Sequence, residues 1–129
     1  MSDFNFKSQV CTSKIQSERL LALGLKKETA DMCWTKVGPK SRTYYVPELA
    51  PINMVSWRHT PAWSLHRLIE MIQEVCPQVV IIFHRVDIRS NVKRIAYSFD
   101  VCDNLYDNII DCIEWLIKEG YFNKEYLEE

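Results

Sequence analysis

Glycine and long hydrophobic runs are both scarce in this chain of 129 residues. Only three glycines are present, and no G-x-G-x-x-G or G-K-[ST] string occurs, so we expect no glycine-rich phosphate loop. The longest uninterrupted apolar run, residues 79–83, has five residues, whereas a membrane-spanning helix needs roughly 20. The sequence therefore argues against a P-loop nucleotide enzyme and against a membrane protein.

The chain also lacks a large net charge. Its 16 basic and 17 acidic side chains leave a formal charge of -1, which attracts the whole chain to neither nucleic acid nor anionic lipid. The two halves differ, because residues 1–60 hold nine basic and five acidic side chains and residues 61–129 hold seven and twelve. Such asymmetry is typical of a nucleic-acid-binding face or of a head-to-tail contact between two copies.

The five cysteines are odd in number, and no two of them have C-x-x-C spacing. The first ten residues, MSDFNFKSQV, contain neither a basic nor an apolar signal region, so we expect no secretory signal. The sequence therefore predicts a cytoplasmic protein with reduced thiols. The three histidines lack zinc-ligand spacing, so we expect no metal and no other cofactor.

Composition predicts one globular domain over residues 1–129. Hydrophobic residues make up 47% of the chain and charged residues 26%, which is close to the average of folded domains. The polar ends of the chain, residues 1–10 and 123–129, are expected to fray.

The first helical unit is predicted from its capping residues. Ser13 and Gln16 have the spacing of a capping box, in which each side chain bonds the other residue's backbone N–H. Gly24 is a helix-ending residue because it tolerates positive φ. Residues 26–32 then support one or two further helical turns.

Two more helices are predicted on the same grounds. Thr60 is a favourable N-cap, and Pro61 suits the first helical position after it. Asp103 or Asn104 caps the last helix, and Gly120 closes it. The carboxylates that repeat every four residues along that helix are expected to form a solvated stripe.

The strands are predicted as two β-hairpins. Residues 33–37 and 42–46 flank a Gly-Pro turn, and residues 79–89 and 92–101 form the clearest hairpin. One further short strand is expected at residues 53–57. The element order α-α-β-β-α-β-β-α predicts an α+β fold, in which a small antiparallel sheet from two β-hairpins carries about three main helices.

Scattered strings carry a family resemblance: SERLL at residues 17–21, TADM at 29–32, TPAWSL at 60–65, WL at 115–116 and EGY at 119–121. Through them the chain resembles a family of short uncharacterised proteins encoded by gut bacteria and their phage-like mobile elements. The resemblance implies a soluble cytoplasmic product of mobile-element origin, and it supplies no catalytic residues.

Aromatic and arginine side chains are concentrated between residues 34 and 67. Such side chains dominate protein-binding hot spots because they combine large contact area with a polar end. The alternative is that these rings cover a sheet face and fix the proline-rich connector. The candidate partner-binding set is Trp34, Tyr44, Tyr45, Trp57, Arg58, Trp63 and Arg67.

The basic N-terminal half offers a candidate nucleic-acid surface. Against it, the second helical segment is too short for a recognition helix, and no basic-aromatic RNA-binding string occurs. The candidate nucleic-acid set is Lys14, Arg19, Lys26, Lys27, Lys36, Lys40 and Arg42.

A small Cys/His enzyme is the third hypothesis. It requires the fold to join His59 or His84 to Cys33 or Cys102. The aspartates at positions 100 and 103 oppose a thiolate at Cys102, because like charges disfavour ionisation. The sequence therefore favours a non-enzymatic protein-interaction module that binds a protein partner or a second copy of itself, with nucleic-acid binding as the alternative.

Overall fold

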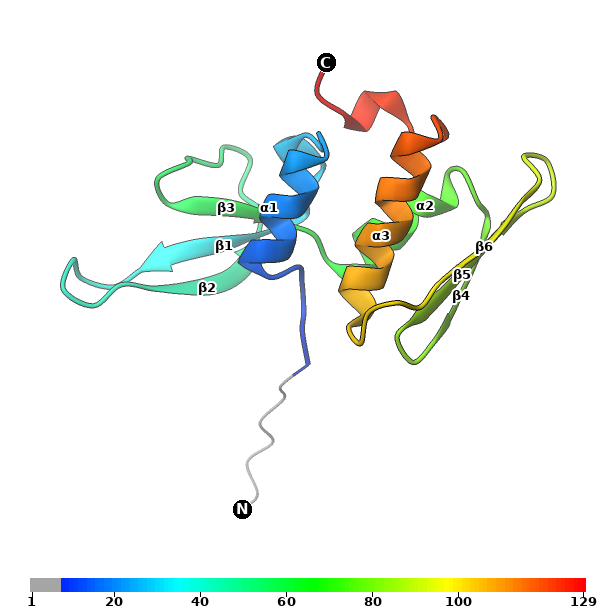
Figure 1. The fold of residues 1–129 in the computed structure, drawn as a ribbon. Helices are drawn as coiled ribbons and strands as arrows, with labels where there is room; N and C mark the ends of the chain where they lie inside the picture. The colour runs from blue at the N-terminus through cyan, green and yellow to red at the C-terminus, as the bar shows by residue number, and fades with distance from the viewer. Residues whose placement is uncertain (1–7) are drawn as a thin grey trace.

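The computed structural model describes residues 8–129, which form an α+β fold of three helices and two separate three-stranded antiparallel sheets (Figure 1). The helices are α1 (Lys14–Ala22), α2 (Leu65–Gln73) and α3 (Leu105–Lys118). The first sheet has the strand order β2-β1-β3, with β1 (Met32–Val37), β2 (Tyr44–Leu49) and β3 (His59–Ala62). The second has the order β4-β5-β6, with β4 (Gln78–Ile82), β5 (Arg85–Ser90) and β6 (Ile95–Phe99).

The α+β class is confirmed, but the prediction of one sheet and of the order α-α-β-β-α-β-β-α is wrong. The observed order is α-β-β-β-α-β-β-β-α, apart from two short 3-10 turns, η1 (Lys27–Thr29) and η2 (Lys124–Tyr126). Strand β3 pairs with the second edge of β1 and completes the first sheet, and within the described residues no strand of that sheet pairs with the second sheet. The second sheet lies at the opposite end of the molecule, with the helices between the two sheets (Figure 1).

The predicted helix ends of α1 and α3 agree with the structure. The Ser13 side chain accepts from the Gln16 backbone N–H, and the Gln16 side chain accepts in return from the Ser13 N–H. Asn104 caps α3, since its side chain accepts from the Asp107 N–H at 3.2 Å. Local capping chemistry therefore fixes where both helices begin.

The predicted start of the second helix and the predicted strand at residues 53–57 are both wrong. Thr60 and Pro61 lie in β3, opposite Trp34 and Cys33 of β1. Helix α2 begins later, at Leu65, after the N-cap Ser64, whose side-chain oxygen accepts from the Arg67 N–H. Proline is tolerated in β3 because β3 is an edge strand and needs no further donor.

The second predicted hairpin contains three strands instead of two. The apolar run breaks at Phe83 and His84, where the chain turns from β4 into β5. Phe83 adopts φ +56 in this turn. Because the turn folds the run back on itself, inward residues such as Ile81 and Val86 pair on the face that packs on α3.

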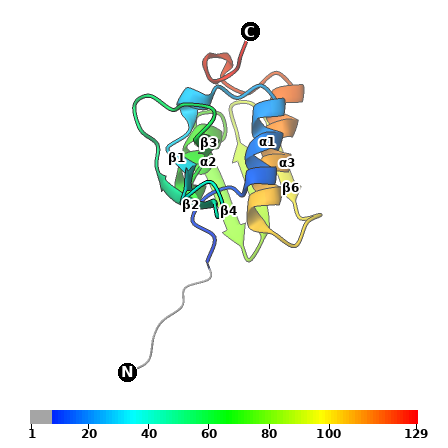
Figure 2. The same cartoon turned by 90° about the vertical axis from the view of Figure 1, so that its left-hand side faces the viewer.

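The core lies between the sheets and includes Trp63, which directly follows β3. Trp63 has no exposed surface, and its indole N–H donates to Thr29 Oγ1 at 2.9 Å. Its backbone N–H donates to Thr12 Oγ1 at 3.1 Å. Helices α1 and α3 lie side by side next to this core in both views (Figures 1 and 2).

The C-terminal segment is paired with the chain that follows α1. Leu127 forms an isolated antiparallel bridge with Leu25, and the Lys26 N–H donates to the Tyr126 carbonyl at 2.8 Å. Part of the predicted fraying segment thus has backbone partners. Of the N-terminal segment predicted to fray, residues 1–7 lie outside the described residues, and residues 8–10 are exposed. No helix in the described part of the chain has the length and apolar character that crossing a membrane requires.

Candidate functional site

An open hollow of about 590 Å³ lies at the end of the first sheet, between the turn of the β1–β2 hairpin and the loop that precedes β3. Figure 2 views the molecule from this end. Three basic side chains line the hollow: Lys36 from β1, Lys40 from the hairpin turn and Arg58 from the loop. Trp57 lines it as well, with 75% of its surface exposed.

The hairpin turn that carries Lys40 is set by Gly38. Gly38 has φ +95, and a Cβ at this position would lie 2.5 Å from the Arg42 carbonyl oxygen. The Arg42 N–H donates to the Pro39 carbonyl at 2.9 Å, which closes the turn. Only glycine fits this close approach, and the resulting turn leaves Lys40 and Arg42 exposed.

The opposite wall is held by hydrogen bonds around Val55. The Arg58 and His59 backbone N–H groups both donate to the Val55 carbonyl, at 3.0 and 2.8 Å. The Val55 N–H donates to His59 Nδ1 at 3.0 Å. The Arg58 carbonyl accepts from the Lys36 N–H at 2.8 Å. This network fixes Trp57 beside the end of β1.

A second aromatic and basic group continues the surface along the sheet. Lys36 lies opposite Tyr45 in the β1–β2 ladder, so their side chains share one face of the sheet. The Lys14 ammonium lies 3.6 Å from the centre of the Tyr45 ring, which is a cation–π contact. Tyr44, on the other face, is 57% exposed. We call Lys14, Lys36, Lys40, Arg42 and Arg58, with Tyr44, Tyr45 and Trp57, the basic-aromatic surface.

Acidic side chains are almost absent from this part of the sequence. Between Asp31 and Glu70 the only acidic residue is Glu48. Its carboxylate accepts from Thr35 Oγ1 at 3.1 Å. Within residues 8–129, none of the five cations of the basic-aromatic surface forms an ion pair. Its positive charge is therefore not neutralised by the described chain.

The structure divides the predicted partner-binding set. Tyr44, Tyr45, Trp57 and Arg58 belong to the basic-aromatic surface. The other three side chains have structural partners. Trp63 is buried in the core, and the half-buried Trp34 donates its indole N–H to the Thr12 carbonyl at 2.8 Å. Arg67 donates to the Thr29 carbonyl at 2.8 Å and lies over the Tyr126 ring.

The predicted nucleic-acid set is divided in the same way. Lys14, Lys36, Lys40 and Arg42 belong to the basic-aromatic surface. Lys26 and Lys27 lie at η1, and neither lines the hollow.

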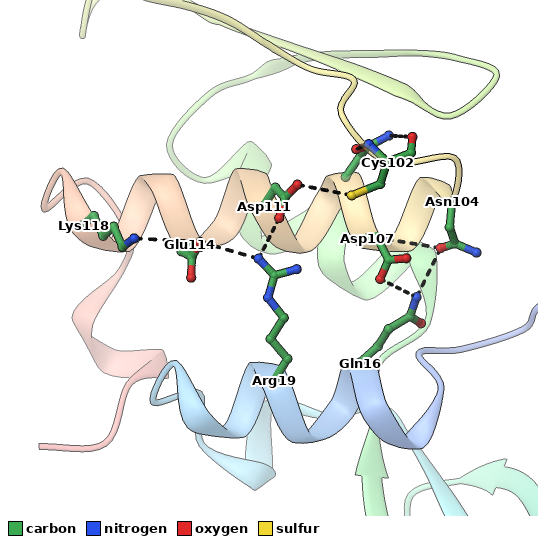
Figure 3. A network of polar contacts seen from close by, with 9 residues as sticks. Gln16, Arg19, Cys102, Asn104, Asp107, Asp111, Glu114 and Lys118 are labelled. Atoms are coloured by element: carbon green, nitrogen blue, oxygen red, sulfur yellow. Dashed lines mark hydrogen bonds and ion pairs between the residues drawn. The ribbon is translucent and has the colours of Figure 1, made fainter.

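Arg19, the remaining residue of that set, joins α1 to α3. Its guanidinium contacts Asp111 at 2.6 Å and Glu114 at 3.5 Å (Figure 3). The Gln16 side chain donates to Asp107 at 2.8 Å in the same interface. The predicted solvated stripe on the last helix therefore faces α1 in part, and its carboxylates hold the two helices together.

The residues proposed for a Cys/His enzyme share one link, because the Asn108 side chain bonds the backbone of both Cys102 and His84. Their side chains have other partners. Buried Cys33 contacts Thr35, and Cys102 donates to Asp111 at 3.6 Å. His84 contacts Asp100 at 3.2 Å, and no hydrogen bond within residues 8–129 joins a histidine to a cysteine. Burial and the neighbouring Asp111 carboxylate raise the pKa of Cys102, which disfavours a nucleophilic thiolate.

No group of three or more metal-binding side chains occurs in the part of the chain that the structure describes.

The sequence predicted every member of the basic-aromatic surface as a binding residue but divided these residues between two different surfaces. The nearly acid-free stretch between Asp31 and Glu70 is the sequence signal that could have assigned these residues to one surface.

No protein-family model, curated protein or solved structure matches this chain.

Proposed function

We propose that this protein is a non-enzymatic binding module that holds an anionic partner on the basic-aromatic surface. One observation carries the proposal: three cations and the exposed Trp57 line one hollow, and two further cations lie over the adjoining sheet and in the hairpin turn, all without an ion-pair partner in the described chain. The hollow is lined by Lys36, Val37, Gly38, Lys40, Thr43, Trp57 and Arg58. These side chains supply hydrogen-bond donors and aromatic surface rather than an imidazole, thiol or carboxylate.

Electrostatics supports an anionic partner. Cations that gather without counter-charges raise the local positive potential and attract anions to the site. In the same chain Arg19 and Lys118 contact carboxylates on α3. The chain thus neutralises cations that pack on α3 and leaves those at the hollow available.

Binding to heparin, a sulfated polyanion, tests this proposal at increasing salt. The variant Lys36→Ala/Lys40→Ala/Arg58→Ala should elute at markedly lower salt than the wild type, because each lost contact reduces the salt-dependent part of binding. The charge-matched control Lys26→Ala/Lys27→Ala/Lys118→Ala should elute close to the wild type. Equal shifts for the two variants, or no retention of the wild type, contradict the proposal.

Self-association is a second candidate, favoured by the outer edge of β4. Within the described residues β4 pairs only with β5, so its other edge is free. The strand carries no charged residue, and Val80 and Ile82 are exposed. Phe83 at the adjoining turn is 93% exposed. Exposed edges of this kind pair with other strands unless charges or bulges prevent it.

Sedimentation velocity over a range of concentrations tests self-association through β4. The wild type should dimerise as concentration rises, and Val80→Lys should remain monomeric because it places a charge on the edge. Val92→Lys, at a more exposed site in the turn between β5 and β6, is the control and should dimerise. A wild type that stays monomeric at all concentrations removes this candidate.

The mobile-element origin and the cytoplasmic location remain proposals. The first rests on the family resemblance, and the genes that neighbour this one would test it. The second rests on the unpaired cysteine pattern, and fractionation of the producing cells would test it.

A further inference from the structure

We infer that the anionic partner is a single-stranded nucleic acid, with its phosphates on the cations and one base stacked on Trp57. This inference rests on the proposed function, since it identifies the partner of the same surface. Proteins that bind single strands combine a positive groove with aromatic side chains on which bases stack. The basic-aromatic surface has both components.

The exposure of Trp57 is the first argument. The Trp57 indole is 75% exposed, so it contributes little to the stability of the fold. Exposing so large an apolar side chain to water is also unfavourable. Hydrogen bonds around Val55 nevertheless fix the adjoining backbone, because Arg58 and His59 both donate to its carbonyl. An exposed aromatic side chain on a fixed backbone is suited to stacking on a planar ligand.

The alternation of charge and ring along the surface is the second argument. Lys14 lies over the Tyr45 ring, and Tyr45 lies opposite Lys36. Lys36 lines the hollow together with Trp57 and Lys40. Neighbouring cross-strand side chains are about 5 Å apart. The surface therefore presents cations and rings in turn along an extended path, as the phosphates and bases of a single strand require.

The size of the hollow is the third argument. A volume of about 590 Å³ falls in the range of sites that hold one drug-sized ligand, roughly 300–1,000 Å³. One nucleotide belongs to that size class. The hollow is bounded by loops and a sheet end, and no helix projects from it, so it lacks the element that usually enters the major groove of a duplex.

An acidic peptide and a duplex are the rival partners. An acidic peptide satisfies the cations but makes no specific use of an exposed indole. A duplex keeps its bases stacked inside, so it offers phosphates to Lys36 and Lys40 but no base to Trp57. Both rivals therefore predict that Trp57 contributes little to binding.

Fluorescence titration of the full chain compares four probes: an oligothymidylate of about ten nucleotides, a DNA duplex, polyglutamate and heparin. We expect the oligothymidylate to quench tryptophan fluorescence and to bind more tightly than the duplex or polyglutamate. A plot of log binding constant against log salt concentration should have a slope of about −0.7 for each phosphate contact. If about four of the five cations contact phosphates, the total slope should be about −3. Lys40→Ala should make the slope less steep by about 0.7.

Substitutions at Trp57 give the decisive comparison, with binding followed by anisotropy of a labelled oligonucleotide. Trp57→Ala should weaken oligothymidylate binding by about tenfold or more, and Trp57→Phe should retain most of it because a ring remains. Ile52→Ala, which removes a fully exposed apolar side chain from the same loop, is the matched control. It should bind like the wild type.

The possible failures separate the two proposals. If heparin, duplex or polyglutamate binds as tightly as the single strand and Trp57→Ala has no effect, the inference is wrong while the proposed function stands. If the wild type binds no polyanion at low salt, the proposed function is wrong and the inference falls with it. Equal loss in Trp57→Ala and Ile52→Ala also contradicts base stacking on Trp57.

Discussion

The Thr29 hydroxyl accepts a hydrogen bond from the indole N–H of Trp63, a residue 34 positions later in the sequence. Both residues are buried. Replacing Thr29 by valine keeps the side-chain shape but removes the oxygen that accepts from the indole. A buried donor without an acceptor costs about 1–3 kcal/mol.

We therefore predict that Thr29→Val lowers the free energy of unfolding by about 1–3 kcal/mol, measured by urea denaturation. Thr43→Val is the control, because Thr43 is exposed at the hairpin turn, and it should change the free energy by less than about 0.5 kcal/mol. Equal effects of the two substitutions contradict the role assigned to Thr29.

Cys102 is the one cysteine in residues 8–129 that is not buried. Burial and the Asp111 carboxylate raise the pKa of its thiol. A raised pKa reduces the thiolate fraction at neutral and mildly alkaline pH, and the thiolate is the reactive form. Cys102 should therefore react more slowly with iodoacetamide at pH 8 than an unperturbed thiol does.

The substitution Asp111→Asn tests this account, since it removes a charge that opposes ionisation and should speed alkylation of Cys102, followed by mass spectrometry under native conditions. Asp103→Asn is the control: Asp103 is adjacent in sequence but is not among the groups that shift the pKa of Cys102. An unchanged rate in Asp111→Asn, or an equal increase in both variants, contradicts the account.

At the scale of helices, the contact between α1 and α3 includes a charged pair. Arg19 and Asp111 lie 2.6 Å apart, and their side chains are 35% and 28% exposed. Partial burial strengthens such a pair relative to surface ion pairs. We predict a coupling of about 1 kcal/mol from a double-mutant cycle of Arg19→Ala and Asp111→Ala, with unfolding as the measurement.

The pair His66 and Glu70 is the control for this cycle. It lies on one face of α2 at 3.7 Å, with side chains 85% and 48% exposed. Its coupling should stay below about 0.5 kcal/mol. A coupling for Arg19 and Asp111 no larger than this control, or one unaffected by high salt, argues against a stabilising charged contact between the helices.

The elements that sequence predicts correctly are those fixed by local chemistry. The cap at Ser13 and the cap at Asn104 involve residues three positions apart, so their signals are complete within a short window. Thr60 and Pro61 show the opposite case. They have the local pattern of a helix start, but pairing with β1 places them in a strand. That pairing joins segments about 26 residues apart, which no local pattern reports.

The break between β4 and β5 is also invisible in the sequence. Residues 79–83 form a continuous apolar run, and the usual turn residues glycine, asparagine and proline are missing where the chain turns. Phe83 adopts φ +56 instead. The candidate site was predictable only in part for a similar reason, because Trp57 and Lys40 come from different loops that meet only in the folded chain.

At the scale of the whole molecule, positive and negative side chains are concentrated in different parts of the chain. Lys36, Lys40 and Arg58, which lack an ion-pair partner in the described chain, line the hollow on the first sheet. Carboxylates are concentrated from residue 100 onward, with nine acidic and two basic side chains. We therefore expect the proposed anionic ligand to approach the first sheet and to be repelled by α3.

Nuclear magnetic resonance of the four tryptophan indole N–H groups separates base stacking on Trp57 from binding elsewhere on the chain. On addition of a short oligothymidylate, the account predicts that the Trp57 resonance shifts while those of buried Trp63, of Trp34 bound to Thr12 and of Trp115 packed on Tyr97 stay in place. A Trp57 resonance that does not move at saturating ligand, or a larger shift of another indole resonance than of Trp57, would contradict base stacking on Trp57.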